Sequence, residues 1–260
     1  MQYEENKTSI SRFNDNVEYY AKYRPNYPQE VMQIIKNEFY LDAGSLIADI
    51  GSGTGIFTKL LLDKKYQVLA IEPNTPMRHK AEQDLSHYTN FTSYATTAEA
   101  TGLDENSIDC ITVATAFHWF NKDAAKKEFL RILKPDGWCL LVWNLRDVEA
   151  SPYMRDMEAL FKQYGIDYTT SAAEKMDEAA VVNFFKPTEV TIAQFSNHQL
   201  FDWEGLKGRL LSISYLPKPG MPDYEEMESA FKRIFDKYQT NGQIAYQYQT
   251  KCYYSQLKLK

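Results

Sequence analysis

Cysteine is scarce in this chain of 260 residues, and the three that occur, Cys110, Cys139 and Cys252, are far apart. Their spacing fits neither a disulfide framework nor a set of metal ligands. Cys110 and Cys139 lie in apolar runs typical of strands, and Cys252 lies among tyrosines. We therefore expect reduced cysteines, no metal site and a cytoplasmic protein.

Long hydrophobic runs are absent too. No apolar stretch approaches the roughly 18 residues that suggest a membrane-spanning helix. The beginning of the chain, Met-Gln-Tyr-Glu-Glu, lacks the basic and apolar regions of a signal peptide. We therefore expect no membrane partner.

Positive charge is in deficit, with 29 Lys and Arg against 35 Asp and Glu, a net charge of −6. Nucleic-acid-binding proteins usually present a basic face, and the one basic cluster here is the tail Lys251, Lys258 and Lys260. Nucleic acid is therefore an unfavoured partner. The 19 tyrosines and 14 phenylalanines favour a small-molecule substrate cavity, although most of them should be core. We expect a monomer or a homodimer.

Glycine is also sparse, yet three of the 11 glycines stand at alternate positions in the segment Asp49-Ile-Gly-Ser-Gly-Thr-Gly55. The preceding run, 46–50, is short and apolar, as a buried strand should be, and 56–62 has helical spacing. The glycines therefore lie on a strand-to-helix turn, where a missing Cβ lets a ligand approach the backbone. The candidate ligand-binding residues here are Asp49, Gly51, Ser52, Gly53 and Gly55.

An acidic residue closes the next predicted strand, 67–71. Glu72 follows the glycines by about twenty residues, where a carboxylate accepts hydrogen bonds from ribose hydroxyls. The glycine turn and Glu72 together predict an adenosine-containing cofactor. A dinucleotide site needs a further glycine three residues after the second one, and that position is Ile56. A nicotinamide-dependent oxidoreductase is thus the less favoured alternative.

Apolar runs alternate with helical patterns over residues 31–146, which predicts an α/β fold with a doubly wound parallel sheet. Strands are expected at 46–50, 67–71, 90–94, 108–113 and 138–143, and helices at 56–62, 75–84 and 122–133. Thr75 should cap the second helix ahead of Pro76, and Lys134-Pro-Asp-Gly137 should end the third.

Beyond residue 146 the alternation breaks. Strands near 188–200 and 243–258 should complete a Rossmann-like sheet of about seven mostly parallel strands, with helices on both faces. Helices are expected at 151–165, 172–182, 203–213 and 224–238. We expect one domain, 1–260, in which residues 1–30, 147–187 and 201–241 form a helical cap over the core.

Five segments together resemble the class I S-adenosylmethionine-dependent methyltransferases in order and spacing. They are Asp49–Gly55, Glu72-Pro73-Asn74, Ala98-Glu99, Ala114–Phe120 and Leu133–Gly137. The resemblance covers residues 43–146 and is closest to the small-molecule branch that includes trans-aconitate and quinone-biosynthesis methyltransferases. Trp138 replaces a glycine that is common in the family, at a position that should not affect the cofactor, S-adenosyl-L-methionine.

The resemblance also implies roles for individual residues in binding the cofactor. Residues 49–55 would pass beneath its methionine and ribose parts, and the Glu72-Pro73 segment would hold the ribose. The Ala98 N–H would meet the adenine ring, and Glu99 would accept from its amine or would be an exposed residue. Thr115 and Ala116 would contact the amino group of the methionine part.

Three further residues are candidates, two of them with a structural alternative. Trp119 would form a pocket wall near the sulfonium, which aromatic faces attract. His118 would act as a general base, or would merely hydrogen-bond the backbone. Arg24 would pair with the methionine carboxylate, or would be a surface residue before a turn.

The predicted function is methyl transfer by in-line displacement to O, N or C of a small-molecule acceptor, for which orientation supplies much of the catalysis. Three alternatives stay open at this point. They are an NAD(P)-dependent oxidoreductase, a non-catalytic S-adenosylmethionine-binding module, and a methyltransferase that acts on protein or nucleic acid.

Overall fold

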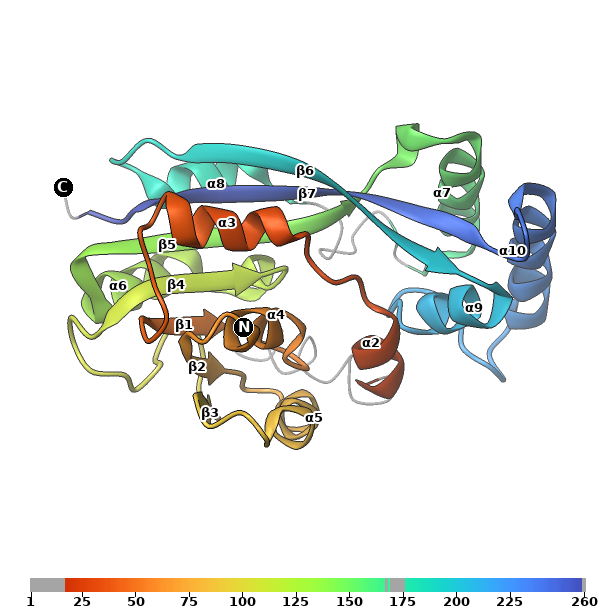
Figure 1. The fold of residues 1–260 in the computed structure, drawn as a ribbon. Coiled ribbons are helices and arrows are strands. Elements are labelled where there is room, and N and C mark those ends of the chain that lie inside the picture. Colours follow the sequence, from red (N-terminus) through yellow and green to blue (C-terminus); the bar gives the residue numbers. More distant parts are fainter. Residues whose placement is uncertain (1–16, 167, 169–175, 259–260) are drawn as a thin grey trace.

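A seven-stranded sheet forms the centre of the protein, for which the computed structural model describes residues 17–166, 168 and 176–258. The strand order is β3-β2-β1-β4-β5-β7-β6 (Figure 1). The strands β3, β2, β1, β4 and β5 run parallel, and β7 is antiparallel to both of its neighbours. The predicted mostly parallel sheet is confirmed. The strands are β1 (Leu46–Ile50), β2 (Gln67–Ile71), β3 (Phe91–Tyr94), β4 (Ile108–Ala114), β5 (Leu133–Arg146), β6 (Thr191–Phe201) and β7 (Ile244–Gln256).

Helices cover both faces of the sheet because the central strands are apolar on both sides. In β1, Ala48 and Ile50 face one hydrophobic cluster and Ile47 faces the other, as the two-residue period of a strand requires. One cluster includes residues of α6 (Lys122–Ile132) and α8 (Glu178–Phe185). The other includes residues of α3 (Gln29–Asn37), α4 (Ile56–Asp63) and α5 (Thr75–Leu85), on the opposite face (Figure 1).

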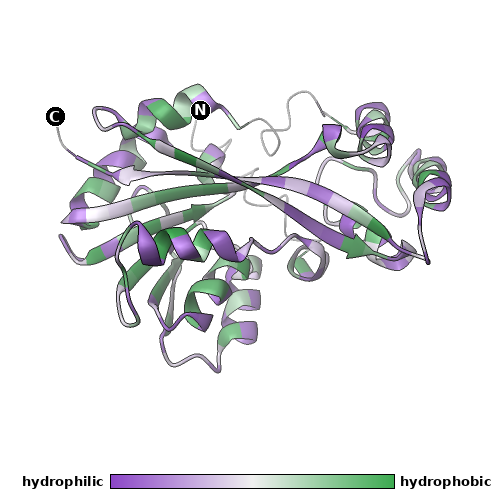
Figure 2. Cartoon of the chain, turned by 45° about the horizontal axis from the view of Figure 1, so that its top comes forward, coloured by the Kyte–Doolittle hydropathy of each residue, from purple (hydrophilic) through white to green (hydrophobic). Residues whose placement is uncertain are grey.

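A third hydrophobic cluster lies at the far ends of β6 and β7. It includes residues of α7 (Pro152–Tyr164), α9 (Trp203–Leu211) and α10 (Tyr224–Tyr238), together with Tyr246 and Tyr248 of β7. Strand β7 therefore contributes to the core sheet at one end and to this helical lobe, the cap, at the other (Figure 1). In Figure 2 the long strands cross at the centre, with the cap helices at one end.

The short helix α2 (Val17–Tyr23) connects the two parts. Glu18 pairs with Lys80 of α5 at 3.2 Å, and Tyr23 packs so closely on α9 that a Cβ added at Gly208 would lie 2.2 Å from its ring. The side-chain amide of Gln199 in β6 also donates to the carbonyls of Tyr23 and Arg24, at 3.3 and 3.4 Å. Helix α2 therefore holds the cap against the core on one side. Helices α2 and α3 are not predicted from the sequence.

Several predicted boundaries differ from the structure. Asn74, not Thr75, caps α5, because its side chain accepts from the Met77 N–H at 3.0 Å. The segment predicted to end α6 belongs to β5, which begins at Leu133 opposite Ile108, before a register shift. The helix predicted at 172–182 occurs as α8, at Glu178–Phe185, while residues 172–175 lie outside the described part. The division of the chain into core and cap remains a prediction.

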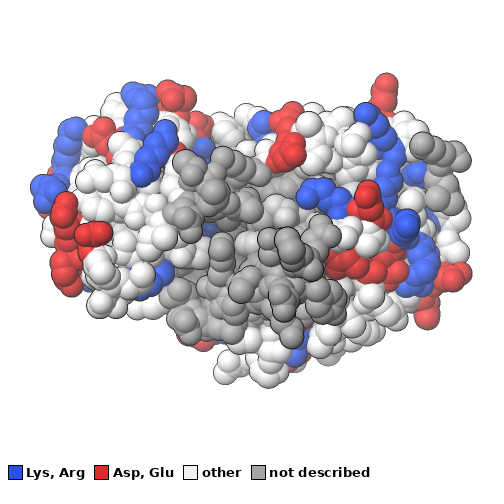
Figure 3. All heavy atoms as spheres, turned by 180° about the vertical axis from the view of Figure 1, so that it is seen from behind, with Lys and Arg blue, Asp and Glu red and all other residues white. Residues whose placement is uncertain are grey.

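All three cysteines are buried and free. Within the described residues, no group of three or more His, Cys, Asp and Glu is placed to hold a metal ion. Over the same residues, no helix is long and apolar enough to cross a bilayer. On the face drawn in Figure 3, basic and acidic side chains are interspersed at both ends of the molecule.

Candidate active site

The glycine turn leaves β1 in a conformation that favours glycine. Gly51, Gly53 and Gly55 have φ of 70°, 58° and 83°, the left-handed region that costs a residue with a Cβ about 1–2 kcal/mol. A Cβ added at Gly51 would lie 2.4 Å from Ala116 Cβ, and one at Gly55 would lie 2.7 Å from Leu85. The turn therefore packs tightly against the end of β4 on one side and against α5 on the other.

Gly53 differs from the other two glycines of the turn. A Cβ added there would have only the Met77 sulfur within 4 Å, at 3.9 Å. The neighbouring Thr54 is buried, and its hydroxyl has no hydrogen-bond partner in the described structure. An open backbone position beside an unsatisfied buried hydroxyl is suited to a ligand with polar groups.

Asp49 lies beneath this turn and is fully buried. Its two carboxylate oxygens accept from Thr58 of α4 at 2.6 Å and from Thr112 of β4 at 2.9 Å. Burial raises the pKa of Asp49 to about 6, although both hydrogen bonds oppose the shift. In this arrangement Asp49 ties β1, β4 and α4 together, so its observed role is to support the turn. Its contact with the cofactor remains a prediction.

We expect the stability of the protein to depend on the ionisation of Asp49. The folded pKa of about 6 lies above the ordinary value of 3.8 for this group. The contribution of Asp49 to stability is therefore complete below pH 3.8 and is lost as pH rises through 6. Between about pH 4 and pH 7, the free energy of unfolding of Asp49→Asn should therefore rise relative to that of the wild type by on the order of 2–3 kcal/mol. Urea unfolding of both proteins across this range measures the difference. A difference that stays constant with pH would contradict the buried ionisable carboxyl.

Glu72 closes β2 directly beside the glycine turn and is 7 % exposed. Its oxygens accept from the backbone N–H groups of Gly53 at 2.8 Å and Asn74 at 2.7 Å. Burial raises the pKa of Glu72, against the effect of these two hydrogen bonds and of Arg78. Each carboxylate oxygen can accept a second hydrogen bond, so the carboxylate keeps capacity for two hydroxyl groups. Pro73 lies in the same segment and is partly buried.

The end of β4 contains a strained residue. Thr115 has φ of 56°, which is an outlier for a β-branched side chain, and its N–H donates to Val142 at 2.8 Å. Its hydroxyl is 3.0 Å from the hydroxyl of Tyr27, whose ring packs edge-on against Phe57. Strain of this kind concentrates at functional sites. The contact places the segment after α2 against the end of β4, next to Ala116.

His118 and Trp119 follow Thr115 on the short 3-10 helix η2 (Phe117–Trp119). Burial, with a contribution from Lys122, lowers the pKa of His118 to about 4, so the imidazole is neutral at pH 7. Its Nε2 is buried and has no partner in the described structure. The Trp119 ring lies 4.7 Å from the imidazole. At Nε2 the structure therefore does not support the alternative in which His118 only forms a hydrogen bond with the backbone.

The predicted adenine-binding residues lie in a turn after β3. Ala98 is buried, and Glu99 accepts from the N–H of Asn121, the residue that caps α6, at 2.8 Å. The structure thus places Glu99 in a turn that contacts the start of α6. Arg24 lies further away, toward the cap, where its Nη2 donates to the Ser212 carbonyl at 2.9 Å.

The structure brings the carboxyl ends of β1, β2 and β4 together, with the glycine turn, Glu72 and Thr115. Three residues of this arrangement, Tyr27, Thr58 and Thr112, are not predicted from the sequence. For Tyr27 a signal existed in the Tyr- and Pro-rich segment 19–28. No sequence signal existed for Thr58 or Thr112, because their contacts to Asp49 depend on how α4 and β4 pack.

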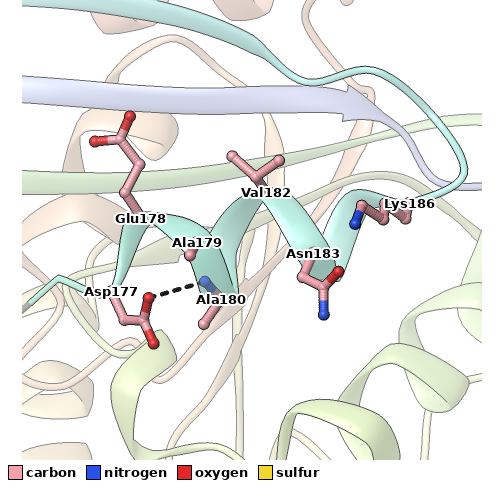
Figure 4. A pocket seen from close by; sticks show the side chains of 7 residues that line it. All are labelled: Asp177, Glu178, Ala179, Ala180, Val182, Asn183 and Lys186. Atoms are coloured by element: carbon pink, nitrogen blue, oxygen red, sulfur yellow. Dashed lines mark hydrogen bonds between the residues drawn. The ribbon is translucent and has the colours of Figure 1, made fainter.

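Two surface depressions lie apart from this arrangement. One, of about 640 Å³, lies on the exposed side of α8 (Figure 4). Its lining is Asp177, Glu178, Ala179, Ala180, Val182, Asn183 and Lys186. The other, of about 320 Å³, lies near the ends of β6 and β7. Neither includes a residue of the glycine turn or Glu72.

The residues at the strand ends fit S-adenosylmethionine. The open position at Gly53 and the unsatisfied Thr54 hydroxyl offer room and a polar contact, and Glu72 offers a buried acceptor for ribose hydroxyls. The position of the third glycine of a dinucleotide site is Ile56, the first residue of α4. This agrees with a cofactor that carries no phosphate.

Comparison with known proteins also supports an S-adenosylmethionine site. Residues 48–141 match the family described as a methyltransferase domain. An uncharacterized methyltransferase-like protein of Schizosaccharomyces pombe is 28 % identical over 251 residues, 95 % of this chain and 96 % of that protein. An uncharacterized methyltransferase of Geobacillus kaustophilus is 30 % identical over 164 residues, 60 % of this chain and 69 % of that protein.

The fold also agrees with a solved structure from Anaeromyxobacter dehalogenans that is named provisionally as a type II methyltransferase. It has a TM-score of 0.64 and 16 % identity, and the match covers 90 % of this chain and 98 % of that chain. These comparisons do not favour the oxidoreductase or the binding-only alternative. The chain belongs to the class I S-adenosylmethionine-dependent methyltransferases, and S-adenosylmethionine is its cofactor.

Proposed function

We propose that the protein transfers the methyl group to O, N or C of a small-molecule acceptor. The observation that carries the proposal is the position of α2, which contacts α5 of the core through Glu18 and α9 of the cap through Tyr23. A helix held on both sides above the strand ends favours a small acceptor over a polymer. The resemblance to the branch that contains trans-aconitate and quinone-biosynthesis methyltransferases supports the same class.

S-adenosylmethionine supplies an already activated methyl group on a sulfonium. The task of the chain is therefore to orient the acceptor and to exclude water. Glu72 and the glycine turn hold the adenosine, Trp119 forms the wall beside the acceptor, and Tyr27 closes the site at Thr115. Pro73, Ala98, Glu99 and Ala116 keep their predicted cofactor contacts as part of this proposal. The pairing of Arg24 with the methionine carboxylate stays a prediction outside it, because Arg24 donates to Ser212 of the cap. We also propose a cytoplasmic monomer or homodimer without a nucleic-acid partner.

His118 is proposed to receive a proton from the acceptor when the nucleophile is a hydroxyl group. A neutral imidazole with a free, buried Nε2 is able to accept one, although a pKa of about 4 makes it a weak base. We expect His118→Gln to lower kcat by about 10²-fold, at the low end for general-base catalysis, without changing the affinity for S-adenosylhomocysteine.

The test is a screen of small carboxylates, phenols and amines for S-adenosylhomocysteine release, read by mass spectrometry together with a product 14 mass units heavier, since CH3 replaces H. His198→Gln, at a histidine on β6, is the matched control and should leave kcat unchanged. No product with any small acceptor, together with methylation of a protein or RNA preparation, would contradict the proposal. Equal kcat values in His118→Gln and the wild type would remove His118 from the reaction.

A further inference from the structure

Three cations gather around one point where α2 meets the cap. Arg24 donates to the Ser212 carbonyl at 2.9 Å, and Arg209 donates to the Ser212 hydroxyl at 3.1 Å. Lys218 donates to the carbonyls on either side of Ser212, at 2.6 and 2.5 Å. Arg209 is 4 % exposed, and the other two side chains are partly buried. We call Arg24, Arg209 and Lys218 the cation cluster.

No carboxylate balances this charge in the part of the chain that the structure describes. The ion pairs found there include none of the three cations. Their other neighbours are neutral: Arg209 donates to the Tyr248 hydroxyl at 3.2 Å, and Arg24 lies over the Tyr20 ring at 4.7 Å. Buried cations are normally paired, because removing an ion from water costs several kcal/mol.

The end of α9 explains part of the arrangement, but not all of it. A helix C-terminus carries roughly half a negative charge, and the carbonyls around Ser212 lie just after that end. The described residues therefore leave most of three positive charges uncompensated. Burial lowers the pKa of Lys218 to about 8, and the charge of Arg24 adds to the shift. Burial also lowers the pKa of Arg24, and Arg209 is the next cause.

The cluster also has unused hydrogen-bonding capacity. The Nε of Arg24 is buried and has no acceptor in the described structure. Arg24 precedes Tyr27 by three residues, and the Tyr27 hydroxyl reaches Thr115 at the end of β4. The cluster therefore lies on the cap side of the strand ends, and the glycine turn and Glu72 lie on the core side.

We propose that the cation cluster binds an oxyanion of the methyl acceptor, a carboxylate or a phosphate. This inference rests on the proposed function and names its substrate class. Two arginines and a lysine match the acceptor oxygens of such groups in charge and in hydrogen bonding. Because Arg209 and Lys218 belong to the cap, the cluster selects the acceptor while the strand ends hold the cofactor.

Calorimetry on the full chain saturated with S-adenosylhomocysteine tests the proposal, with succinate and inorganic phosphate titrated separately. We expect at least one of them to bind, and its affinity to fall at least tenfold in Lys218→Met and in Arg209→Met. Lys232→Met, at an exposed cation on α10 that pairs with Asp236, is the control and should leave the affinity unchanged. Which probe binds distinguishes carboxylate from phosphate. Lys218→Met carries the test if Arg209→Met does not fold by circular dichroism.

Three results would overturn the inference. The first is that neither oxyanion binds a protein that binds S-adenosylhomocysteine normally. The second is equal oxyanion affinity in the wild type and Lys218→Met. The third is a tenfold loss of S-adenosylhomocysteine affinity in Lys218→Met, which would assign the cluster to the methionine carboxylate of the cofactor. A wild-type protein that does not bind S-adenosylhomocysteine at all would instead contradict the proposed function.

Discussion

Gly51→Ala should abolish measurable binding of S-adenosylhomocysteine, whereas Gly44→Ala should leave it unchanged. Both glycines have a positive φ, 70° at Gly51 and 97° at Gly44, so both variants carry the backbone strain of about 1–2 kcal/mol. A new Cβ at position 44 meets nothing within 4 Å, but one at position 51 would lie 2.4 Å from Ala116 Cβ. Only Gly51→Ala therefore pushes the end of β4 away from the glycine turn.

Calorimetric titration of the two variants measures this effect, and thermal unfolding reports the strain that they share. Gly44→Ala should lose stability without losing affinity for S-adenosylhomocysteine. The assignment of the glycine turn fails if Gly51→Ala binds as tightly as Gly44→Ala.

Glu72→Ala should weaken S-adenosylhomocysteine binding by about 1–3 kcal/mol, the range for leaving buried polar groups without a partner. The variant removes the acceptor for the ribose hydroxyls. It also leaves the N–H groups of Gly53 and Asn74 without the acceptor that they have in this structure. Loss of affinity and some loss of stability are therefore expected together.

Two further variants separate these effects in the same calorimetric assay. Glu72→Gln keeps the size of the side chain but places an amide N–H₂ against one of the backbone donors, so it should also bind weakly. Glu82→Ala, at a partly exposed acid of α5 that pairs with Arg78, should bind normally. Unchanged affinity in Glu72→Ala would remove the ribose assignment.

The core sheet was predictable because its signals are local. The apolar run of β1, the glycines after it and the acid that closes β2 lie within 27 residues, from Leu46 to Glu72. Turn chemistry and the strand period act between neighbours in sequence, so the motif carries its own geometry. The parallel direction of β1, β2, β3, β4 and β5 follows from the alternation of strands and helices.

Boundaries were less predictable, since neighbouring residues compete for the same role. Asn74 and Thr75 are both good capping residues, and in the structure Asn74 caps α5. The Lys134-Pro-Asp-Gly137 segment follows the end of α6 at Ile132, as predicted, but it lies within β5 at a register shift. The pairing of Leu133 with Ile108 therefore starts this strand earlier than the apolar run at 138–143 predicts.

The sequence alone determined the glycine turn, the paired acid and the parallel sheet, because each depends on spacing within a few tens of residues. Only the tertiary structure decided which distant side chains meet. Thr112 reaches Asp49 across 63 residues, Tyr27 reaches Thr115 across 88, and Arg24 reaches Ser212 across 188. Such contacts depend on how whole elements pack, which residue spacing does not encode.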